Sequence, residues 1–201
     1  MNFNFKYRKY AEALYSALSE NAFYITMEES IENCESSKEA MLRYMEFSMT
    51  EGEISGELYI PEDHEYGASI WTKPINHELE TKKHHEKKLF LLNKMGNRSL
   101  KTYNTIVDFM LAKAEPFIGK NFWYLSIVGI LPEFQGQGLG PGLIKNVLKK
   151  TDALKVSTYL ETFTPRNMTF YKRLGYQEIK SFNEPTTKAE YWLMIREPSN
   201  A

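Results

Sequence analysis

Apolar residues near the start of the chain recur at helical spacing. We expect a first helix over residues 6–20, with apolar side chains on one face. A second helix is expected from residue 37 to about 50, because Ser36 and Glu39 have the spacing of a capping box. The period then falls to two over residues 54–60 and 67–73, which predicts a hairpin-like pair of strands.

Helical spacing resumes over residues 77–117, where we expect two helices. Ser99 is the predicted N-cap of the second. Its apolar side chains form one stripe of seven residues: Leu100, Tyr103, Ile106, Val107, Met110, Leu111 and Ala114.

The remaining segments alternate between strands and helices. Residues 123–130 are apolar almost throughout, as in a strand buried on both faces. A helix follows at 143–150, then a strand at 155–161 and a helix at 165–174, where Thr164 is the predicted cap. Two strands close the chain: 176–182 and 189–196. This order predicts an α/β protein with a mixed sheet.

Composition narrows the class of protein. A chain of 201 residues, 42% hydrophobic, suits one domain over residues 1–201. A net charge of −1 with evenly spread charges does not indicate a nucleic-acid or membrane surface. One cysteine, Cys34, excludes an internal disulfide. Without a long apolar run or the apolar core of a signal peptide, we expect a cytoplasmic protein.

A glycine-rich turn separates the strand at 123–130 from the next helix. Gly136, Gly138 and Gly140 alternate there, and Pro141 fits the first helical turn. Backbone N–H groups of such a turn can bind a phosphate or pyrophosphate, although a plain tight turn would have the same composition. Neither a P-loop nor a dinucleotide fingerprint fits the spacing.

The frame Gln135-x-x-Gly138-x-Gly140 resembles the acyl-CoA pyrophosphate loop of the GNAT superfamily of N-acyltransferases. A second match lies about thirty residues on: residues 159–176 resemble that superfamily's next strand and helix, which end in Phe-Tyr-x-x-Leu-Gly-Tyr. Residues 191–198 are similar to its closing strand. The part upstream, through SIWTKP, resembles the small-molecule branch that includes puromycin N-acetyltransferase-like proteins.

The resemblance implies a mostly antiparallel central sheet flanked by helices, and acetyl-CoA as co-substrate without a metal. A small-molecule primary amine would attack directly in a ternary complex, in a monomer or homodimer. Two alternatives remain: a non-catalytic CoA-binding regulatory module and a protein N-acetyltransferase. The residues implied to bind coenzyme A are Val128, Gly129, Ile130, Gln135, Gly136, Gln137, Gly138, Leu139, Gly140, Thr164, Asn167 and Tyr171.

Two residues are implied to be catalytic. Tyr171 would protonate the departing thiolate, and we expect it at an edge of its helix with its hydroxyl free; the alternative is a core tyrosine. Glu161 would be the general base, through water; the alternative is a solvated strand-end carboxylate. Glu133 is a weaker candidate for the base. The family's pantetheine-contacting asparagine falls here at Thr164, whose hydroxyl could replace it or only cap the helix, whereas Asn167 is three residues further on.

Two features outside these motifs complete the prediction. Adjacent His84 and His85 point in different directions on a helix, which disfavours a metal site. The helical segment 77–118 is expected to cover the substrate side of the domain and so to favour a small amine over an extended peptide.

Overall fold

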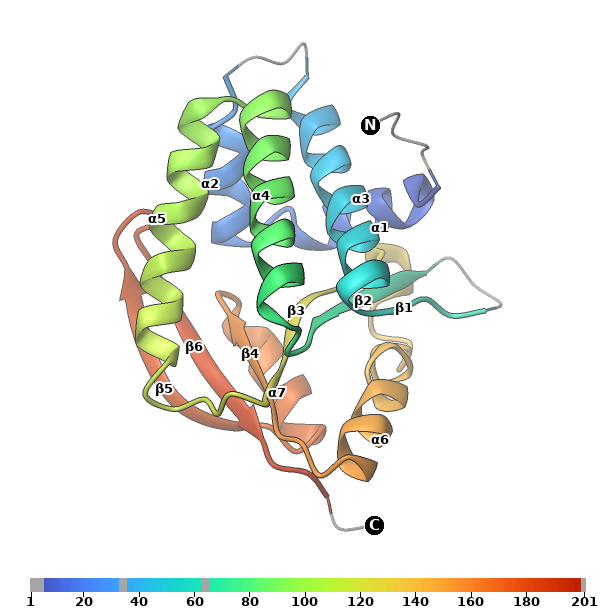
Figure 1. Cartoon of the computed structure of the whole chain (residues 1–201). Helices are drawn as coiled ribbons and strands as arrows, with labels where there is room; N and C mark the ends of the chain where they lie inside the picture. Colours follow the sequence, from blue (N-terminus) through green and yellow to red (C-terminus); the bar gives the residue numbers. More distant parts are fainter. Residues whose placement is uncertain (1–5, 33–35, 63–65, 200–201) are drawn as a thin grey trace.

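The computed structural model describes residues 6–32, 36–62 and 66–199, so Cys34 lies outside the described residues. Helices α1 to α5 lie on one side of a six-stranded sheet, and α6 and α7 lie on the other (Figure 1). No helix in these ranges is long and apolar enough to cross a membrane.

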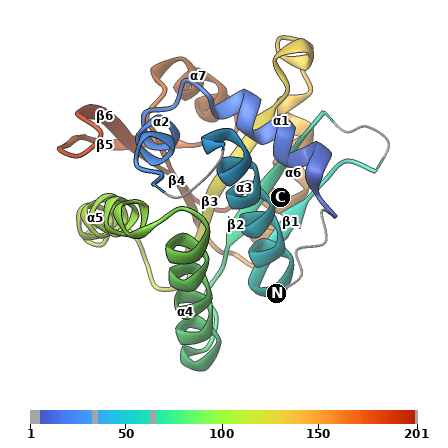
Figure 2. The ribbon, with the colours of Figure 1, turned by 90° about the horizontal axis from the view of Figure 1, so that it is seen from above.

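Five helices make up the larger helical layer. Their bounds are α1 Arg8–Leu18, α2 Ala22–Glu29, α3 Ser37–Ser55, α4 His77–Lys94 and α5 Asn97–Ala114. Figure 2 shows α1 and α3 over β1, β2 and β3, with α4 and α5 beside them. Four of the five were expected, and the Ser36 hydroxyl caps α3 by accepting from the Glu39 N–H at 3.3 Å.

One of these helices was missed and one predicted cap was wrong. Helix α2 was not expected; it has only eight residues and is capped by the Asn21 side chain, which accepts from the Phe23 N–H. Ser99 does not cap α5, whose N-cap is Gly96. Ser99 lies one turn inside the helix, fully buried, and its hydroxyl donates to the Met95 carbonyl. Gly96 has a φ of 101°, which explains the choice of residue at that helix start.

The sheet has the order β1-β2-β3-β4-β6-β5. Only β3 and β4 pair in parallel, which confirms the mixed, mostly antiparallel sheet. Residue 54, expected in the first strand, belongs to the last turn of α3. The strands are β1 Gly56–Tyr59, β2 Gly67–Thr72, β3 Trp123–Ile130, β4 Thr158–Thr162, β5 Gln177–Glu184 and β6 Ala189–Arg196.

Strand β3 contains a β-bulge that the hydrophobic pattern did not predict. Trp71 pairs with Leu125, but the preceding residue of β2, Ile70, pairs with Ile127. Ser126 is therefore the extra residue, and its hydroxyl donates to the Ile70 carbonyl at 3.0 Å. The bulge reverses which face of the sheet the following residues point to. Leu125 before it and Ile127 after it are therefore buried in different hydrophobic cores, on opposite faces of the sheet.

The connections after β3 and β4 carry the remaining helices. Between β3 and β4 lie two short 3-10 helices, η1 Pro132–Phe134 and η2 Gly140–Leu143, and then α6 Lys145–Ala153. Helix α7, Pro165–Arg173, joins β4 to β5. Gly175 follows its C-cap with a φ of 92°, the left-handed conformation in which a glycine commonly terminates a helix.

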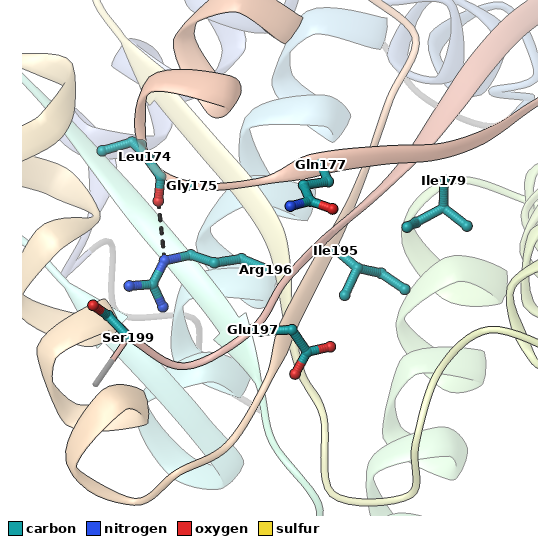
Figure 3. A pocket seen from close by; sticks show the side chains of 8 residues that line it. All are labelled: Leu174, Gly175, Gln177, Ile179, Ile195, Arg196, Glu197 and Ser199. Atoms are coloured by element: carbon teal, nitrogen blue, oxygen red, sulfur yellow. Dashed lines mark hydrogen bonds between the residues drawn. The ribbon is translucent and has the colours of Figure 1, made fainter.

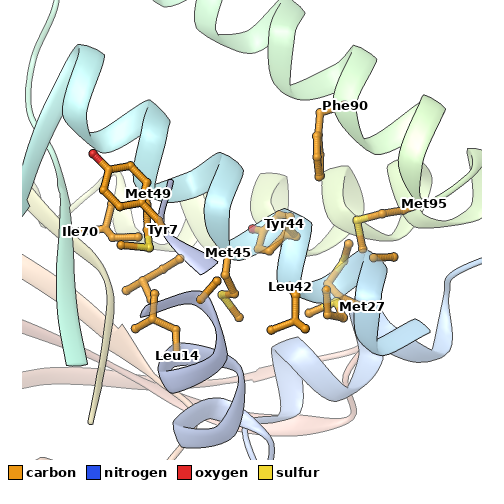
Figure 4. Packing of buried hydrophobic residues seen from close by; sticks show 14 of the residues in the cluster. Tyr7, Leu14, Met27, Leu42, Tyr44, Met45, Met49, Ile70, Phe90 and Met95 are labelled. Atoms are coloured by element: carbon orange, nitrogen blue, oxygen red, sulfur yellow. The ribbon is translucent and has the colours of Figure 1, made fainter. Parts of the chain in front are cut away.

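The two faces of the sheet carry separate hydrophobic cores. Figure 4 shows the core between α1, α3, α4 and the sheet, rich in methionine, with Leu14 and Ile70 on facing elements. The other core packs α6 and α7 against the sheet and includes Leu125, Leu143 and Leu160. Residues of β4 alternate between them, so Leu160 and Glu161 point to opposite faces.

Candidate active site

Strands β3 and β4 separate part-way along their length. They pair from Trp123 and Thr158 to Leu125 and Leu160, and no pair follows. The separation begins at the Ser126 bulge, because a bulge bends its strand and disrupts the ladder. The carboxyl halves of two parallel neighbours therefore leave a gap in the middle of the sheet. Ligands of α/β proteins often bind at such a place.

The glycine turn lies at the mouth of this gap. Five consecutive backbone N–H groups, those of residues 136–140, donate no hydrogen bond within the described part of the chain. The turn is held at its sides instead, since Gln135 Nε2 donates to the Ile130 carbonyl and Gln137 Nε2 donates to the Glu133 carbonyl. Successive unpaired N–H groups beside a helix start can bind an anion such as a pyrophosphate.

The three alternating glycines of the turn are required for two different physical reasons. Gly136 and Gly138 have φ of 75° and 76°, a left-handed conformation that disfavours other residues. A Cβ at either would meet no atom within 4 Å, so the space beside them is open. A Cβ at Gly140 would lie 2.8 Å from the Phe170 ring, so Gly140 lets α7 approach the turn.

The other predicted cofactor residues line the same region. Val128 and Ile130 follow the bulge on β3 and pack against the core beneath α6, as does Leu139 of the turn. Gly129 packs on the opposite side, where a Cβ would lie 3.0 Å from Leu14. The structure thus brings the predicted strand end and glycine turn together around the gap.

Thr164 and Asn167 are placed less favourably than the resemblance implied. Thr164 is the N-cap of α7, but its hydroxyl makes no capping bond, so that prediction was wrong in its mechanism. Its backbone N–H instead donates to Thr162 Oγ1 at 3.2 Å. Asn167 is half-buried on the first turn of α7. Both stay candidates for contacting the cofactor.

Tyr171 is more enclosed than expected. We predicted a position at the edge of the helix, but Tyr171 is 7% exposed, whereas the neighbouring Phe170 is half-buried beside the glycine turn. Rings of Phe170 and Tyr176 lie 5.2 Å and 6.1 Å from it. Burial raises the pKa of the Tyr171 phenol. Its hydroxyl bonds to no described residue, so it is available to a ligand.

Glu161 combines burial with an unpaired oxygen. It follows the last β3–β4 pair, and its Oε1 is buried without a hydrogen-bond partner among the described residues. Burial raises the pKa of this carboxyl to about 7, and the nearby Tyr124 hydroxyl offsets part of that rise. A carboxyl with a pKa near neutrality suits a general base. Glu161 is therefore not the solvated carboxylate of the alternative interpretation.

Tyr171 and Glu161 approach the gap from opposite faces of the sheet. Tyr171 belongs to the core on the α6 and α7 side, and Glu161 points to the side of α2 and α5. Burial is the main cause of the raised pKa of Tyr24 on α2, and the nearby Tyr171 adds to it. Burial likewise raises the pKa of Tyr124 beside Glu161, and Glu161 and Tyr24 add to that rise. The two predicted catalytic groups therefore face one region through the gap.

Other predicted candidates lie outside this region or on its rim. Glu133 is exposed in the loop before the turn, and His84 and His85 are exposed on α4. Across the described ranges, no three His, Cys, Asp or Glu side chains gather as a metal site would require.

A pocket of about 470 Å³ lies at the other end of the sheet, around Gln177 and Ile195 (Figure 3). Ile195 pairs with Tyr159 near the start of β4, whereas the gap opens at its carboxyl end. The Arg196 guanidinium in this pocket is engaged by Asp152 and the Leu174 carbonyl. This pocket contains none of the predicted site residues.

Comparison with known proteins agrees with this geometry. The model of the "Acetyltransferase (GNAT) domain" matches residues 100–178, from α5 through β3, the glycine turn and α7 to the start of β5. A solved structure from Corynebacterium glutamicum, described as histone acetyltransferase HPA2 and related acetyltransferase, superposes over 99% of this chain and 94% of its own, with a TM-score of 0.67 and 17% identity. The chain has the GNAT fold.

Two further solved structures share this GNAT fold. The polyamine N-acetyltransferase of Drosophila melanogaster is 15% identical, with a TM-score of 0.55 over 93% of this chain and 94% of its own. Arylalkylamine N-acetyltransferase 2 of Aedes aegypti is 12% identical, with a TM-score of 0.59 over 95% of each chain. The resemblance to puromycin N-acetyltransferase-like proteins stays a prediction.

Several site residues were not singled out from the sequence. Tyr124, Tyr159 and Tyr191 lie near Glu161, but they come from β3, β4 and β6. Tyr124 could have been found, because it belongs to the strand that leads into the glycine turn. The other two are ordinary tyrosines among 13 in the chain, and only the fold brings them together.

Proposed function

We propose that the protein is an acetyl-CoA-dependent N-acetyltransferase acting on the primary amine of a small molecule. The observation that carries the proposal is the run of five unpaired N–H groups at residues 136–140, beside a gap that Tyr171 and Glu161 face from opposite sides. The match of residues 100–178 to the acetyltransferase (GNAT) domain supports an acetyl-transfer reaction.

Backbone groups of the glycine turn would hold the pyrophosphate of the co-substrate. The unpaired strand edges of β3 and β4 offer hydrogen bonds to an extended chain lying in the gap, as in β-strand addition. Acetyl-CoA would supply an acetyl group activated as a thioester. The residues fit this co-substrate because the N–H donors and the open space beside Gly136 and Gly138 coincide.

Protons would be handled by the two groups at the gap. Glu161 takes the proton that the amine must lose before its nitrogen lone pair attacks the acetyl carbonyl carbon. The new N–C bond forms as the C–S bond breaks, and the Tyr171 hydroxyl protonates the sulfur. Because Glu161 must be ionised to act, turnover should rise as the pH passes about 7.

Helix α5 covers the Glu161 side of the gap, which favours a small acceptor over a peptide. Helix α5 packs against α2 and β5 and supplies the aromatic Tyr103 and Phe109 to that side. The names of the Drosophila and Aedes structures refer to polyamines and arylalkylamines, which are small amines. A purely regulatory CoA-binding module would need neither an acid nor a base facing its ligand.

The test is binding of coenzyme A to the turn. Wild-type protein should gain thermal stability with added coenzyme A, because a ligand bound only to the folded state raises the melting temperature. Gly138→Glu places a carboxylate against the pyrophosphate and should abolish the gain while the protein stays folded. Gln177→Glu adds a charge at the exposed start of β5 and should leave the gain intact.

An unchanged thermal shift in Gly138→Glu would exclude the turn as the cofactor site. A shift lost equally in both variants would mean that net charge, not the turn, controls binding. Release of free thiol from acetyl-CoA with a panel of amines then separates an enzyme from a binding module.

A further inference from the structure

Two buried polar atoms that have no hydrogen-bond partner among the described residues lie on the same face of the sheet. One is Glu161 Oε1 and the other is the hydroxyl of Tyr191, a residue with 0% exposure. Glu161 pairs with Leu193 across β4 and β6, and Tyr191 is two residues away on the same strand. Both side chains therefore point to the side of α2 and α5. Because buried polar groups are nearly always hydrogen-bonded, two neighbouring exceptions indicate a ligand.

Aromatic rings enclose this pair of atoms. Tyr191 lies between Phe163 and Phe182, with ring centroids 5.2 Å and 5.5 Å away, and Ile106 of α5 closes the cluster. Glu184, another carboxylate near Tyr191, already accepts from two backbone N–H groups of the β5–β6 turn. Glu161 Oε1 is thus an acceptor atom without a described partner in an aromatic environment.

A row of rings continues from Glu161 toward α5. Tyr124 stacks on Tyr159 with centroids 4.6 Å apart, and its pKa is also raised by the charge of Tyr24. Phe23 links Tyr24 to Tyr103, at 5.1 Å and 6.3 Å. Phe23 and Tyr24 both belong to α2, and the other three rings come from β3, β4 and α5. All five are half-buried, so solvent still reaches them.

The far end of this row carries charged groups of both signs. Lys87 of α4 lies 6.0 Å from the Tyr103 ring centroid. Lys87 and Lys83 share one carboxylate, Glu51, with N–O distances of 3.3 Å and 4.0 Å. Burial lowers the pKa of both lysines, and a second carboxylate, Asp108, lies near enough to Tyr103 to add to the rise that burial causes in the tyrosine's pKa. These charges offset one another, so the rings, and not a net charge, favour an aromatic group there.

We propose that Glu161 and Tyr191 bind the ammonium of an amine whose body is apolar and aromatic, and that Tyr191 is a determinant of acceptor specificity. This proposal rests on the acetyltransferase function argued above. The ammonium donates to the Glu161 carboxylate and to the Tyr191 oxygen, and the tyrosine rings stabilise its charge and stack on its aromatic body. The same carboxylate then takes the proton before attack.

The ligand class is tested with acetyl-CoA and three probes: 2-phenylethylamine, putrescine and phenylalanine. They represent an aromatic monoamine, a diamine and an aromatic amine with a carboxylate. Thiol release should give a kcat/KM for 2-phenylethylamine at least about tenfold above putrescine, because putrescine has no ring to stack on the tyrosines. A preference for putrescine overturns the proposal. A preference for phenylalanine overturns it too, by assigning the lysine pair to a carboxylate.

The role of Tyr191 is tested by removing one oxygen on either face of the sheet. Tyr191→Phe should raise KM for 2-phenylethylamine about tenfold, the scale of a lost hydrogen bond to a charge, without lowering the melting temperature. Tyr176→Phe is the matched control, because the Tyr176 hydroxyl accepts from Thr158 on the opposite face. That variant should lose thermal stability and keep its KM for the amine.

Failure of this proposal and failure of the proposed function are measured separately. Stabilisation by coenzyme A alone tests the turn and does not involve Tyr191. If coenzyme A binds and thiol is released, but Tyr191→Phe has the wild-type KM for every amine, the acceptor site lies elsewhere. If no amine releases thiol, calorimetric titration of 2-phenylethylamine into the coenzyme A complex still tests the site. Equal affinity of wild type and Tyr191→Phe there overturns the assignment.

Discussion

The two sides of the gap between β3 and β4 offer a ligand different kinds of groups. We call the side of the glycine turn the co-substrate half and the side of Glu161 the acceptor half. On the side of the glycine turn, the groups available to a ligand are backbone N–H donors of five consecutive, mostly exposed residues, 136–140. On the side of Glu161, they are buried side-chain oxygens and aromatic rings, contributed by α2, α5, β3, β4 and β6.

This difference explains what each half can recognise. Backbone donors in a fixed turn bind a feature common to every coenzyme A molecule, so they need only a conformation that glycine permits. Side chains in an enclosed aromatic region select one acceptor from many, so they depend on the identity of each residue. The co-substrate half is therefore local in sequence, and the acceptor half is not.

The largest expected effect is the loss of turnover when the Tyr171 hydroxyl is removed. Tyr171→Phe keeps the ring that packs in the core of α6 and α7 and removes only the hydroxyl. Turnover should fall about a hundredfold or more, the usual scale for a lost general acid. The hydroxyl has no described partner, so the melting temperature should change little. Steady-state thiol release and thermal unfolding of both proteins measure the two quantities.

Affinity for coenzyme A should be unchanged in Tyr171→Phe, because the turn is untouched. A large loss of stability with near-normal turnover would instead make Tyr171 a core tyrosine. In that event the acid would have to come from the Glu161 side, and the division between the two halves would no longer hold.

The co-substrate half could be predicted from the sequence because it is contiguous. Strand β3, the alternating glycines and α7 with its final Gly175 all follow from local patterns, and residues 123–130 match the strand without error. The positive φ of Gly136 and Gly138 is a local property too. Glu161 was found because it ends the strand next to a recognised motif.

The acceptor half could not be predicted, for physical reasons. Helix α2 is too short to show a clear period, and its Tyr24 gains meaning only beside Tyr124 and Tyr171. The bulge at Ser126 has no hydrophobic signature, yet it opens the gap. The position of Ser99 also depends on the folded structure, because its hydroxyl donates to the Met95 carbonyl instead of capping a helix.

A smaller effect tests whether the turn acts through backbone conformation alone. Gly138→Ala adds one methyl group where no atom lies within 4 Å, so any loss comes from its φ of 76°. Left-handed backbone costs an alanine roughly 1–2 kcal/mol. Affinity for coenzyme A should fall about tenfold, measured by calorimetry.

Gly142→Ala is the control for that substitution. It lies in the same turn without a positive φ, and its methyl group would contact only the Tyr66 hydroxyl, at 3.1 Å. Equal losses in the two variants would mean that added bulk, and not the left-handed conformation, weakens binding. The turn would then be a steric feature and not a conformational one.

The smallest expected effect is on the free energy of unfolding, which the buried carboxyl of Glu161 lowers when it is ionised. The folded-state pKa of Glu161 is about 7, above its ordinary value of 4.5. Between these two values the folded protein holds a proton that the unfolded chain has lost. The free energy of unfolding therefore falls as the pH rises from about 4.5 to 7, and it changes no further above that through this group.

Glu161→Gln should consequently stabilise the protein at pH 8 and not at pH 5. A pKa shift of this kind corresponds to a few kcal/mol at most, and the Gln amide also lacks a partner, so we expect a gain of roughly 1 kcal/mol. Chemical denaturation at both pH values measures it. Asp152→Asn is the opposite control, because Arg196 lowers the pKa of Asp152 and its loss should destabilise the protein at pH 8. A Glu161→Gln variant that is less stable than wild type at pH 8 would mean that the carboxylate is paired in solution. The acceptor half would then lack the unpaired carboxylate oxygen that distinguishes it from the glycine turn.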